Sequence, residues 1–174
     1  MNIRVLIILS LFVGIGAVLH AIAPPLLFGM KPDMSLAMMF LGIILFPRIQ
    51  YVLLVSIVTG FVAALTTTFP MGQIPNIVEK PLAGLAFFGL LILLNKVMSQ
   101  HITTPIVTAL GTIISGSLFL SIALFIIGVD IGAGFIALFM TVVLPATVVN
   151  TIAMIVIYPI ALGIMKRAEP IPLS

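Results

Sequence analysis

Cysteine is absent from this chain, and charged residues are rare. Of its 174 residues, 63% are apolar and 6% are charged, with seven cations and four acids. Without thiols the chain can form neither disulfides nor thiolate metal sites, and we expect no metal and no other cofactor. Soluble domains average about 25% charged residues, so these few charges cannot build a water-facing surface. The composition therefore predicts an integral membrane protein surrounded by the lipid bilayer.

Three further absences bear on function. The sequence has no GxxxxGK[ST] phosphate loop, so ATP hydrolysis of that kind would need another chain. Its four acids fall at the ends of apolar runs or in the tail, whereas proton- or sodium-coupled carriers usually keep an ionisable group inside the membrane. No pair of Gly- or Pro-broken runs suggests an inverted repeat. The small net charge of +3 bears on membrane orientation and gives no reason to expect nucleic acid as a partner.

Apolar runs predict an all-α bundle of six membrane-spanning helices, forming a single membrane domain over residues 1–174. About 20 apolar residues are needed to cross the hydrocarbon core. Pro145 divides the last uncharged run, so we expect a separate short helix over 135–143 before the sixth span. The predicted spans are about 5–27, 34–46, 50–69, 81–95, 105–127 and 145–165.

The distribution of cations predicts that both termini are cytoplasmic and that the protein lies in the cell (plasma) membrane. Cytoplasmic loops are enriched in Lys and Arg. The opposite side would carry only Lys31 and Lys80, in the outer loops 28–33 and 70–80. Six spans put both ends of the chain on one side, which then carries Arg4, Arg48, Lys96, Lys166 and Arg167.

Small residues recur along the first span. Ser10, Gly14, Ala17 and Ala21 follow one face of a helix, where another backbone can approach closely. The approaching helix could belong to this chain or to a separate membrane subunit. His20 lies off this face, and it could be a hydrogen-bonded core histidine or a ligand contact.

Two charged patches precede predicted helices on the outer side. The sequence KPD at 31–33 comes before the second span, and EKP at 79–81 comes before the fourth. Asp33 could simply cap its helix, and ordinary solvated loop charges would explain either patch by itself. Together the patches suit an amino acid, whose carboxylate needs a cation or free N–H groups and whose ammonium needs a carboxylate. We predict that the ligand is bound by Lys31, Asp33, Asn76, Glu79 and Lys80.

Polar side chains are rare inside the later spans. Asn150 could form an interhelical hydrogen bond or bind a polar edge of the ligand, and we include it among the candidate ligand-binding residues. Thr108, Thr112 and Ser115 form a small polar stripe that could serve packing or the pocket. A flat apolar ligand group could lie against outer methionine and aromatic side chains. The candidates are Met30, Met34, Phe69, Met71, Phe135 and Phe139.

Residues 16–45, GAVLHAIAPPLLFGMKPDMSLAMMFLGIIL, resemble the TrpP-like tryptophan transport proteins. The likeness continues through FPMGQIPNIVEKP at 69–81 and LPATVVNTIAMIVIYP at 144–159. That family is similar to S-components, the substrate-binding subunits of energy-coupling factor (ECF) transporters. The resemblance implies six helices, a ligand bound near the outer face, and tryptophan as that ligand. We therefore expect a transport protein rather than an enzyme.

The resemblance also implies protein partners. In S-components an Ala-x-x-x-Ala pattern on the first helix meets a transmembrane coupling subunit, which works with two cytoplasmic ATPase subunits. The segment Ala17-Val-Leu-His-Ala21 matches this pattern. Two alternatives stay open. A solitary secondary amino-acid carrier is disfavoured by the positions of the acids, and a non-transport membrane scaffold would leave the paired outer charges unexplained.

Overall fold

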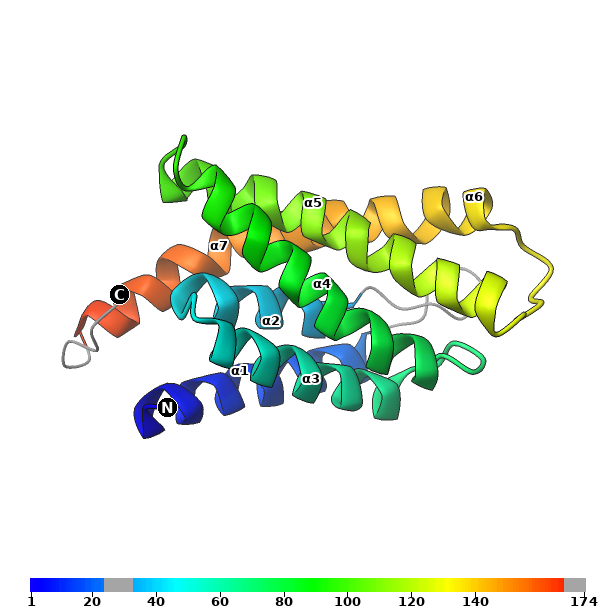
Figure 1. Cartoon of the computed structure of the whole chain (residues 1–174), viewed down its shortest axis with the longest axis horizontal. Helices are drawn as coiled ribbons and strands as arrows, with labels where there is room; N and C mark the ends of the chain where they lie inside the picture. Colours follow the sequence, from blue (N-terminus) through cyan, green and yellow to red (C-terminus); the bar gives the residue numbers. More distant parts are fainter. Residues whose placement is uncertain (24–32, 168–174) are drawn as a thin grey trace.

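The computed structural model describes residues 1–23 and 33–167, and within them every regular element is a helix. The helices run roughly along the long axis of the molecule (Figure 1). The predicted all-α membrane bundle is therefore confirmed. The α-helices are α1 (Ile3–Ile22), α2 (Met34–Leu45), α3 (Ile49–Thr66), α4 (Gln73–Leu94), α5 (Gln100–Ser121), α6 (Phe135–Leu138) and α7 (Leu144–Arg167), with π-helical turns η2 (Ile122–Ile126) and η3 (Phe139–Val143).

Five helical stretches in the described part of the chain are long and apolar enough to cross a membrane. The sixth apolar helix, α2, has only 12 residues, which is about 18 Å at 1.5 Å per residue. All of its residues except Met34 are buried, because α1, α3, α4, α5 and α7 pack around it. The other long helices expose rows of large apolar side chains. This pattern, with apolar surface facing outward, is that of a multi-pass membrane protein.

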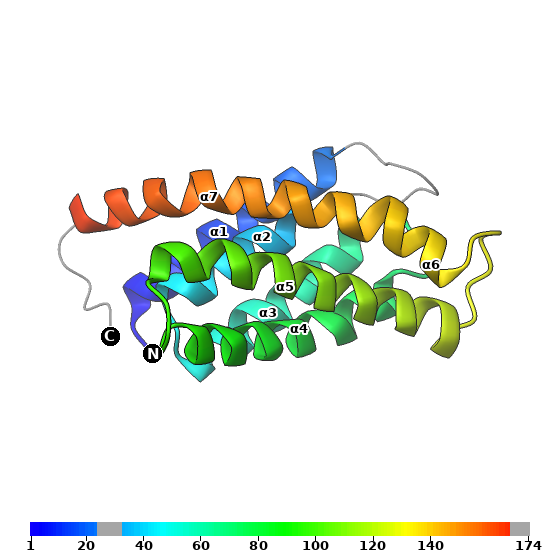
Figure 2. The ribbon, with the colours of Figure 1, turned by 90° about the horizontal axis from the view of Figure 1, so that it is seen from above.

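The described chain turns at two ends of the bundle. The beginning of α1, the α2–α3 turn, the α4–α5 turn and the end of α7 lie together at one end (Figure 1). The α3–α4 turn and the segment between η2 and α6 lie at the other. Seen from above, α7 runs along one side, α5 lies next to it, and α3 and α4 lie on the opposite side (Figure 2). The end that carries the termini is called the inner end below, and the other the outer end.

The last helix differs from the prediction. No separate short helix forms over 135–143, because α6, η3 and α7 make one continuous helical stretch of 33 residues. Proline has no N–H, and its ring crowds the carbonyl four residues earlier. Here Pro145 follows a wider π-helical turn, in which the N–H of Leu144 donates to the carbonyl of Phe139. The π turn accommodates the proline, so the helix continues through it.

Helix α4 also differs from the prediction, because it begins at Gln73 rather than near residue 81. Pro81 lies inside the helix, which membrane helices tolerate. The early turns of α4 pack closely against α3 at Gly60, where a Cβ would come within 3.0 Å of the carbonyl oxygen of Asn76. Asn76, Glu79 and Lys80, expected in a loop, are therefore buried inside a membrane helix.

The core has two apolar clusters. The larger surrounds α2, and at its centre Phe40 and Phe87 stack with ring centroids 3.9 Å apart. The smaller lies toward the outer end and contains Phe69, Leu138 and Val143. Polar and charged side chains lie between these two clusters, and they define the site described next.

Candidate binding site

A cavity opens between the two apolar clusters, bounded by α1, α2, α4, α5 and α7. The centre of a water molecule can occupy a volume of about 80 Å³ inside it. A single buried water needs about 10–15 Å³ on this measure, so the cavity has room for several waters or for part of a small ligand. Its lining includes His20, Asp33, Leu36, Thr67, Thr68, Phe69, Asn76, Glu79, Lys80, Thr112, Ser115, Gly116, Phe119, Val142, Val143, Ala146 and Asn150.

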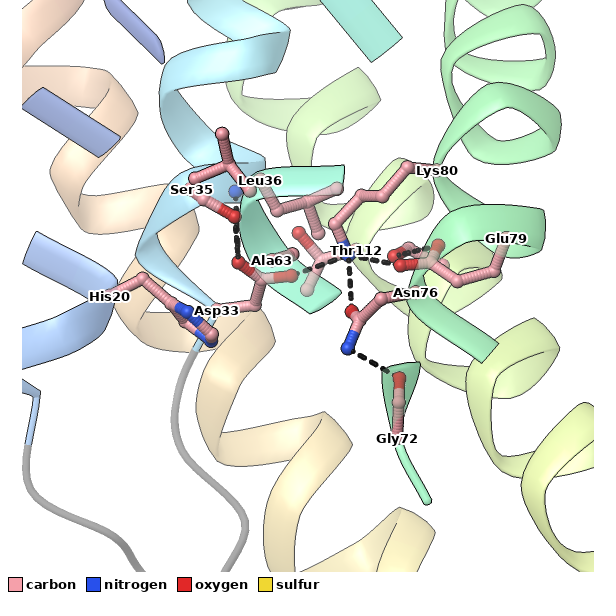
Figure 3. A network of polar contacts seen from close by, with 12 residues as sticks. His20, Asp33, Ser35, Leu36, Ala63, Gly72, Asn76, Glu79, Lys80 and Thr112 are labelled. Atoms are coloured by element: carbon pink, nitrogen blue, oxygen red, sulfur yellow. Dashed lines mark hydrogen bonds and ion pairs between the residues drawn. The ribbon is translucent and has the colours of Figure 1, made fainter. Parts of the chain in front are cut away.

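Lys80 is the centre of a buried network of charges (Figure 3). Its Nζ lies 2.5 Å from Oδ2 of Asp33 and also contacts Oε1 of Glu79. A third, longer contact of 3.5 Å joins Nζ to Oδ1 of Asn76. Glu79 is 0% exposed and Lys80 is 1% exposed. Charges taken this far out of water are stable only when they are paired and hydrogen-bonded.

Local helix geometry brings these groups together. Asn76, Glu79 and Lys80 lie three and four residues apart on α4, so they share one face of the helix. The amide of Asn76 donates to the carbonyl of Gly72 at 2.8 Å, which fixes its oxygen toward Lys80. Asp33 is the N-cap of α2.

The capping role of Asp33 and its ion pair use different oxygens. Oδ1 accepts from the backbone N–H of Leu36 at 3.1 Å and from the hydroxyl of Ser35 at 2.5 Å. Oδ2 contacts Lys80. The expectation that Asp33 caps its helix is therefore correct, and the same carboxylate also faces the cavity.

The charges in this network are unequal. Among the ion pairs of the described residues, two carboxylates face one ammonium, and that ammonium has three N–H donors, which its contacts with Asp33, Glu79 and Asn76 already occupy. A carboxylate can accept about four hydrogen bonds. Glu79 receives one from Lys80 and one from the hydroxyl of Ser115, at 2.7 Å to Oε2. The carboxylates can therefore accept further hydrogen bonds, whereas Lys80 has no donor left to offer. The network thus suits a ligand ammonium, which is a hydrogen-bond donor.

The opposite wall of the cavity is largely apolar. Phe69 and Phe119 meet edge to face with centroids 5.3 Å apart. Helix α5 can approach η3 closely because a Cβ on Gly116 would lie 2.6 Å from Cγ1 of Val143. The cavity therefore places a charged group beside a surface for a flat apolar group.

Asn150 is 0% exposed and lies across from α5. Its Nδ2 is 3.5 Å from the hydroxyl oxygen of Thr112, and its Oδ1 has no hydrogen-bond partner among the described residues. His20 is buried, and its Nδ1 lies 2.7 Å from the hydroxyl of Thr66. The hydrogen-bonded core histidine considered from sequence is present, and this residue also borders the cavity.

The structure brings most of the predicted ligand-binding residues to this one cavity. Asp33, Asn76, Glu79, Lys80 and Asn150 all line it. Lys31 and Met30 lie outside the described residues. Among the expected apolar contacts, Phe69 lines the cavity, whereas Met34, Met71, Phe135 and Phe139 are not part of its lining.

Sequence reasoning missed several apolar lining residues. Gly116, Phe119, Val142, Val143 and Ala146 lie within long apolar runs that carry no local signal of a pocket.

The small-residue stripe of α1 faces away from the bundle. Ser10, Gly14 and Ala21 are exposed, Ala17 is half-buried, and a Cβ on Gly14 would meet nothing within 4 Å. Gly16, off the stripe, packs against α2, where a Cβ would lie 3.1 Å from the Cα of Ser35. Most of this stripe is therefore not buried against the other described helices.

Comparison with known proteins gives consistent matches over more than nine tenths of the chain. A family model described as "Tryptophan transporter TrpP" matches residues 2–166. A "Probable tryptophan transport protein" of Bacillus subtilis is 54% identical over 97% of this chain and 96% of its own length. Proteins with the same description from Clostridium acetobutylicum and Clostridium perfringens are 48% and 36% identical, each over at least 91% of both chains. No solved structure matches the chain.

Proposed function

This chain belongs to the tryptophan transporter TrpP family, and on that premise we propose that it binds L-tryptophan in the cavity between α2, α4, α5 and α7. We further propose that it is the substrate-binding S-component of an ECF importer. The observation that carries the first proposal is the buried network of Asp33, Glu79 and Lys80 beside an apolar wall. An amino acid with a large flat side chain needs both features at once.

The charge network suggests how a zwitterion enters. The substrate ammonium replaces Lys80 on Glu79, which releases an N–H of Lys80 for the substrate carboxylate. Each charge then keeps a partner of opposite sign, so no buried charge is left unpaired. Lys31, outside the described residues, is a second candidate for the carboxylate. The indole ring lies against the wall formed by Phe69, Phe119 and Val142.

The S-component role is supported by two features of the chain. The sequence has no GxxxxGK[ST] phosphate loop, which is consistent with an S-component, whose ATP hydrolysis takes place in separate ATPase subunits. The outward-facing stripe of Ser10, Gly14, Ala17 and Ala21 offers a surface on which a transmembrane coupling subunit can pack closely.

The orientation is proposed from the cations. The inner end of the bundle carries Arg4, Arg48, Lys96, Lys166 and Arg167, so this end is cytoplasmic under the positive-inside rule. Lys80 is buried in the network and does not count as a loop charge of the other side. The cavity then lies nearer the outer face of the cell membrane.

One observation favours a second candidate function, a solitary secondary amino-acid carrier. The sequence disfavours this carrier because no acid falls inside a predicted span, but in the structure Glu79 is buried within α4. An ionisable group in that position is typical of ion-coupled carriers.

Uptake of radiolabelled tryptophan distinguishes these candidates. The chain is expressed alone, and with the coupling subunit and both ATPases, in cells that lack tryptophan uptake of their own. An S-component gives uptake only with the full set, and a variant of the ATPases unable to hydrolyse ATP abolishes it. Uptake by the chain alone that collapses with an uncoupler would establish the carrier instead. Expression of each protein is checked in the membrane fraction.

A further inference from the structure

We infer that the side-chain oxygen of Asn150 accepts a hydrogen bond from the ring N–H of the bound substrate, and so selects indole over rings without a donor. This deepens the proposed function and rests on it. The observation that carries it is an unpaired acceptor in a fully buried side chain that borders the cavity.

The orientation of the Asn150 amide follows from its neighbour on α5. The single hydroxyl hydrogen of Thr112 is donated to the carbonyl of Thr108 at 2.8 Å. The Thr112 oxygen can therefore only accept from Asn150, so it faces Nδ2. This leaves Oδ1 without a partner, and a buried polar atom left unpaired destabilises the protein. A ligand donor would satisfy it.

Asn150 is distinct among the buried side-chain oxygens that lack a partner. In the described part of the chain the others belong to Thr59, Thr103 and Thr151, and none of these residues lines the cavity. They are hydroxyls, which carry their own hydrogen and can rotate. An amide oxygen carries none and can only accept.

The charge network and Asn150 contact neighbouring turns of α5. Ser115, which donates to Glu79, lies one turn along α5 from Thr112, which contacts Asn150. Three residues of helix rise about 4.5 Å. The cavity thus offers an ammonium site and a separate acceptor that contact α5 one helical turn apart. Thr112 and Ser115 also line the cavity, but the Thr112 oxygen faces the Asn150 amide nitrogen and the Ser115 hydroxyl is bound to Glu79, so the Asn150 oxygen is the acceptor left open there.

The test compares two ligands on the wild-type protein and on variants. The ligands are L-tryptophan and 3-(3-benzothienyl)-L-alanine, in which sulfur replaces the ring N–H. Affinities are measured calorimetrically with the purified full chain in detergent. A site that pairs with a donor rejects an analogue without it, so the wild type should bind tryptophan at least about 10-fold more tightly, or ~1.4 kcal/mol. Equal affinities would overturn the inference while leaving the proposed function intact. Absence of tryptophan binding would refute the proposed function and the inference with it.

The variants locate the effect at Asn150. Asn150→Leu should bring the ratio of the two affinities close to one, mainly by weakening tryptophan, and Asn150→Ala should do the same if the leucine variant unfolds. Thr151→Val is the matched control, since it removes an unpaired oxygen from the next residue of the same helix, outside the cavity. It should keep the wild-type ratio. A ratio that stays at the wild-type value in both Asn150 variants would show that this residue only holds helices together.

Discussion

Replacing Glu79 by glutamine tests the charge network with little disturbance of the fold. The substitution removes one negative charge but keeps the shape of the side chain. The new amide oxygen can still accept from Lys80 while the amide nitrogen donates to the hydroxyl oxygen of Ser115, and Lys80 keeps its 2.5 Å contact with Asp33. The variant network then has one cation and one carboxylate. The protein should therefore fold, but the proposed partner of the substrate ammonium is gone.

The magnitude follows from burial. Glu79 is 0% exposed, so solvent cannot replace the lost partner of an incoming ammonium. Truncating one partner of a buried charge pair costs about 2–5 kcal/mol, which is about 30- to 4000-fold in affinity. Calorimetric titration of the purified variant with L-tryptophan measures this loss. The apparent unfolding temperature in detergent, measured in parallel, establishes that the variant is folded.

A matched control is Asp130→Asn, which neutralises an exposed carboxylate at the outer end, outside the cavity lining. Its affinity for tryptophan should match that of the wild type. A folded Glu79→Gln variant with wild-type affinity would refute the assignment of the ammonium to this carboxylate. A similar loss in Asp130→Asn would point to a long-range effect of charge rather than a contact.

Three further substitutions test other parts of the account. Ala17→Leu should hold a partner helix away from α1. Tryptophan uptake by the full transporter should therefore fall, while tryptophan binding to the isolated chain persists. Normal uptake would exclude this face of α1 as the docking surface. Lys80→Met removes the ammonium that contacts both buried carboxylates, Asp33 and Glu79. Breaking a buried pair costs about 3–5 kcal/mol, so the apparent unfolding temperature of this variant should fall sharply; an unchanged value would mean the network does not stabilise the fold. Gly116→Ala places a Cβ 2.6 Å from Cγ1 of Val143. Overpacking of this kind costs about 1–3 kcal/mol, so this variant should be less stable and bind tryptophan more weakly. The control is Gly89→Ala, whose Cβ meets nothing within 4 Å and which should lower neither stability nor binding.

The membrane helices were largely predictable because their signal is local. A run of apolar residues long enough to cross the bilayer can be found in the sequence without knowledge of neighbouring helices. The errors occurred at prolines and charges. Pro145 looked like a break because the π turn that accommodates it leaves no mark in the residue types. The start of α4 was placed too late because Glu79 and Lys80 resemble loop residues when they are considered without their partners.

The site was predictable as a set of residues but not as a network. Charged and polar residues are so rare in this chain that each one stands out, and five of the six proposed ligand-binding residues lie at one cavity. The pairing of Lys80 with Asp33 joins α4 to α2, and the contact of Asn150 with Thr112 joins α7 to α5. Contacts between residues far apart in the chain depend on how the helices pack. Sequence alone could not indicate that Lys80 has no free donor or that Asn150 has an unpaired oxygen.

The most direct test of the central claim is a comparison of three ligands on the purified wild-type chain. Calorimetry measures binding of L-tryptophan, of tryptamine, which lacks the carboxylate, and of indole-3-propionate, which lacks the ammonium. A cavity that recognises a zwitterion beside an apolar ring should bind one tryptophan saturably. Indole-3-propionate should bind at least about 30-fold more weakly, because it brings a third carboxylate to Lys80 and no ammonium for Glu79. Tryptamine still offers its ammonium to Glu79 and loses only the carboxylate contact with Lys80, so its affinity should fall less. Equal affinity for indole-3-propionate, or no binding of tryptophan at all, would contradict the account.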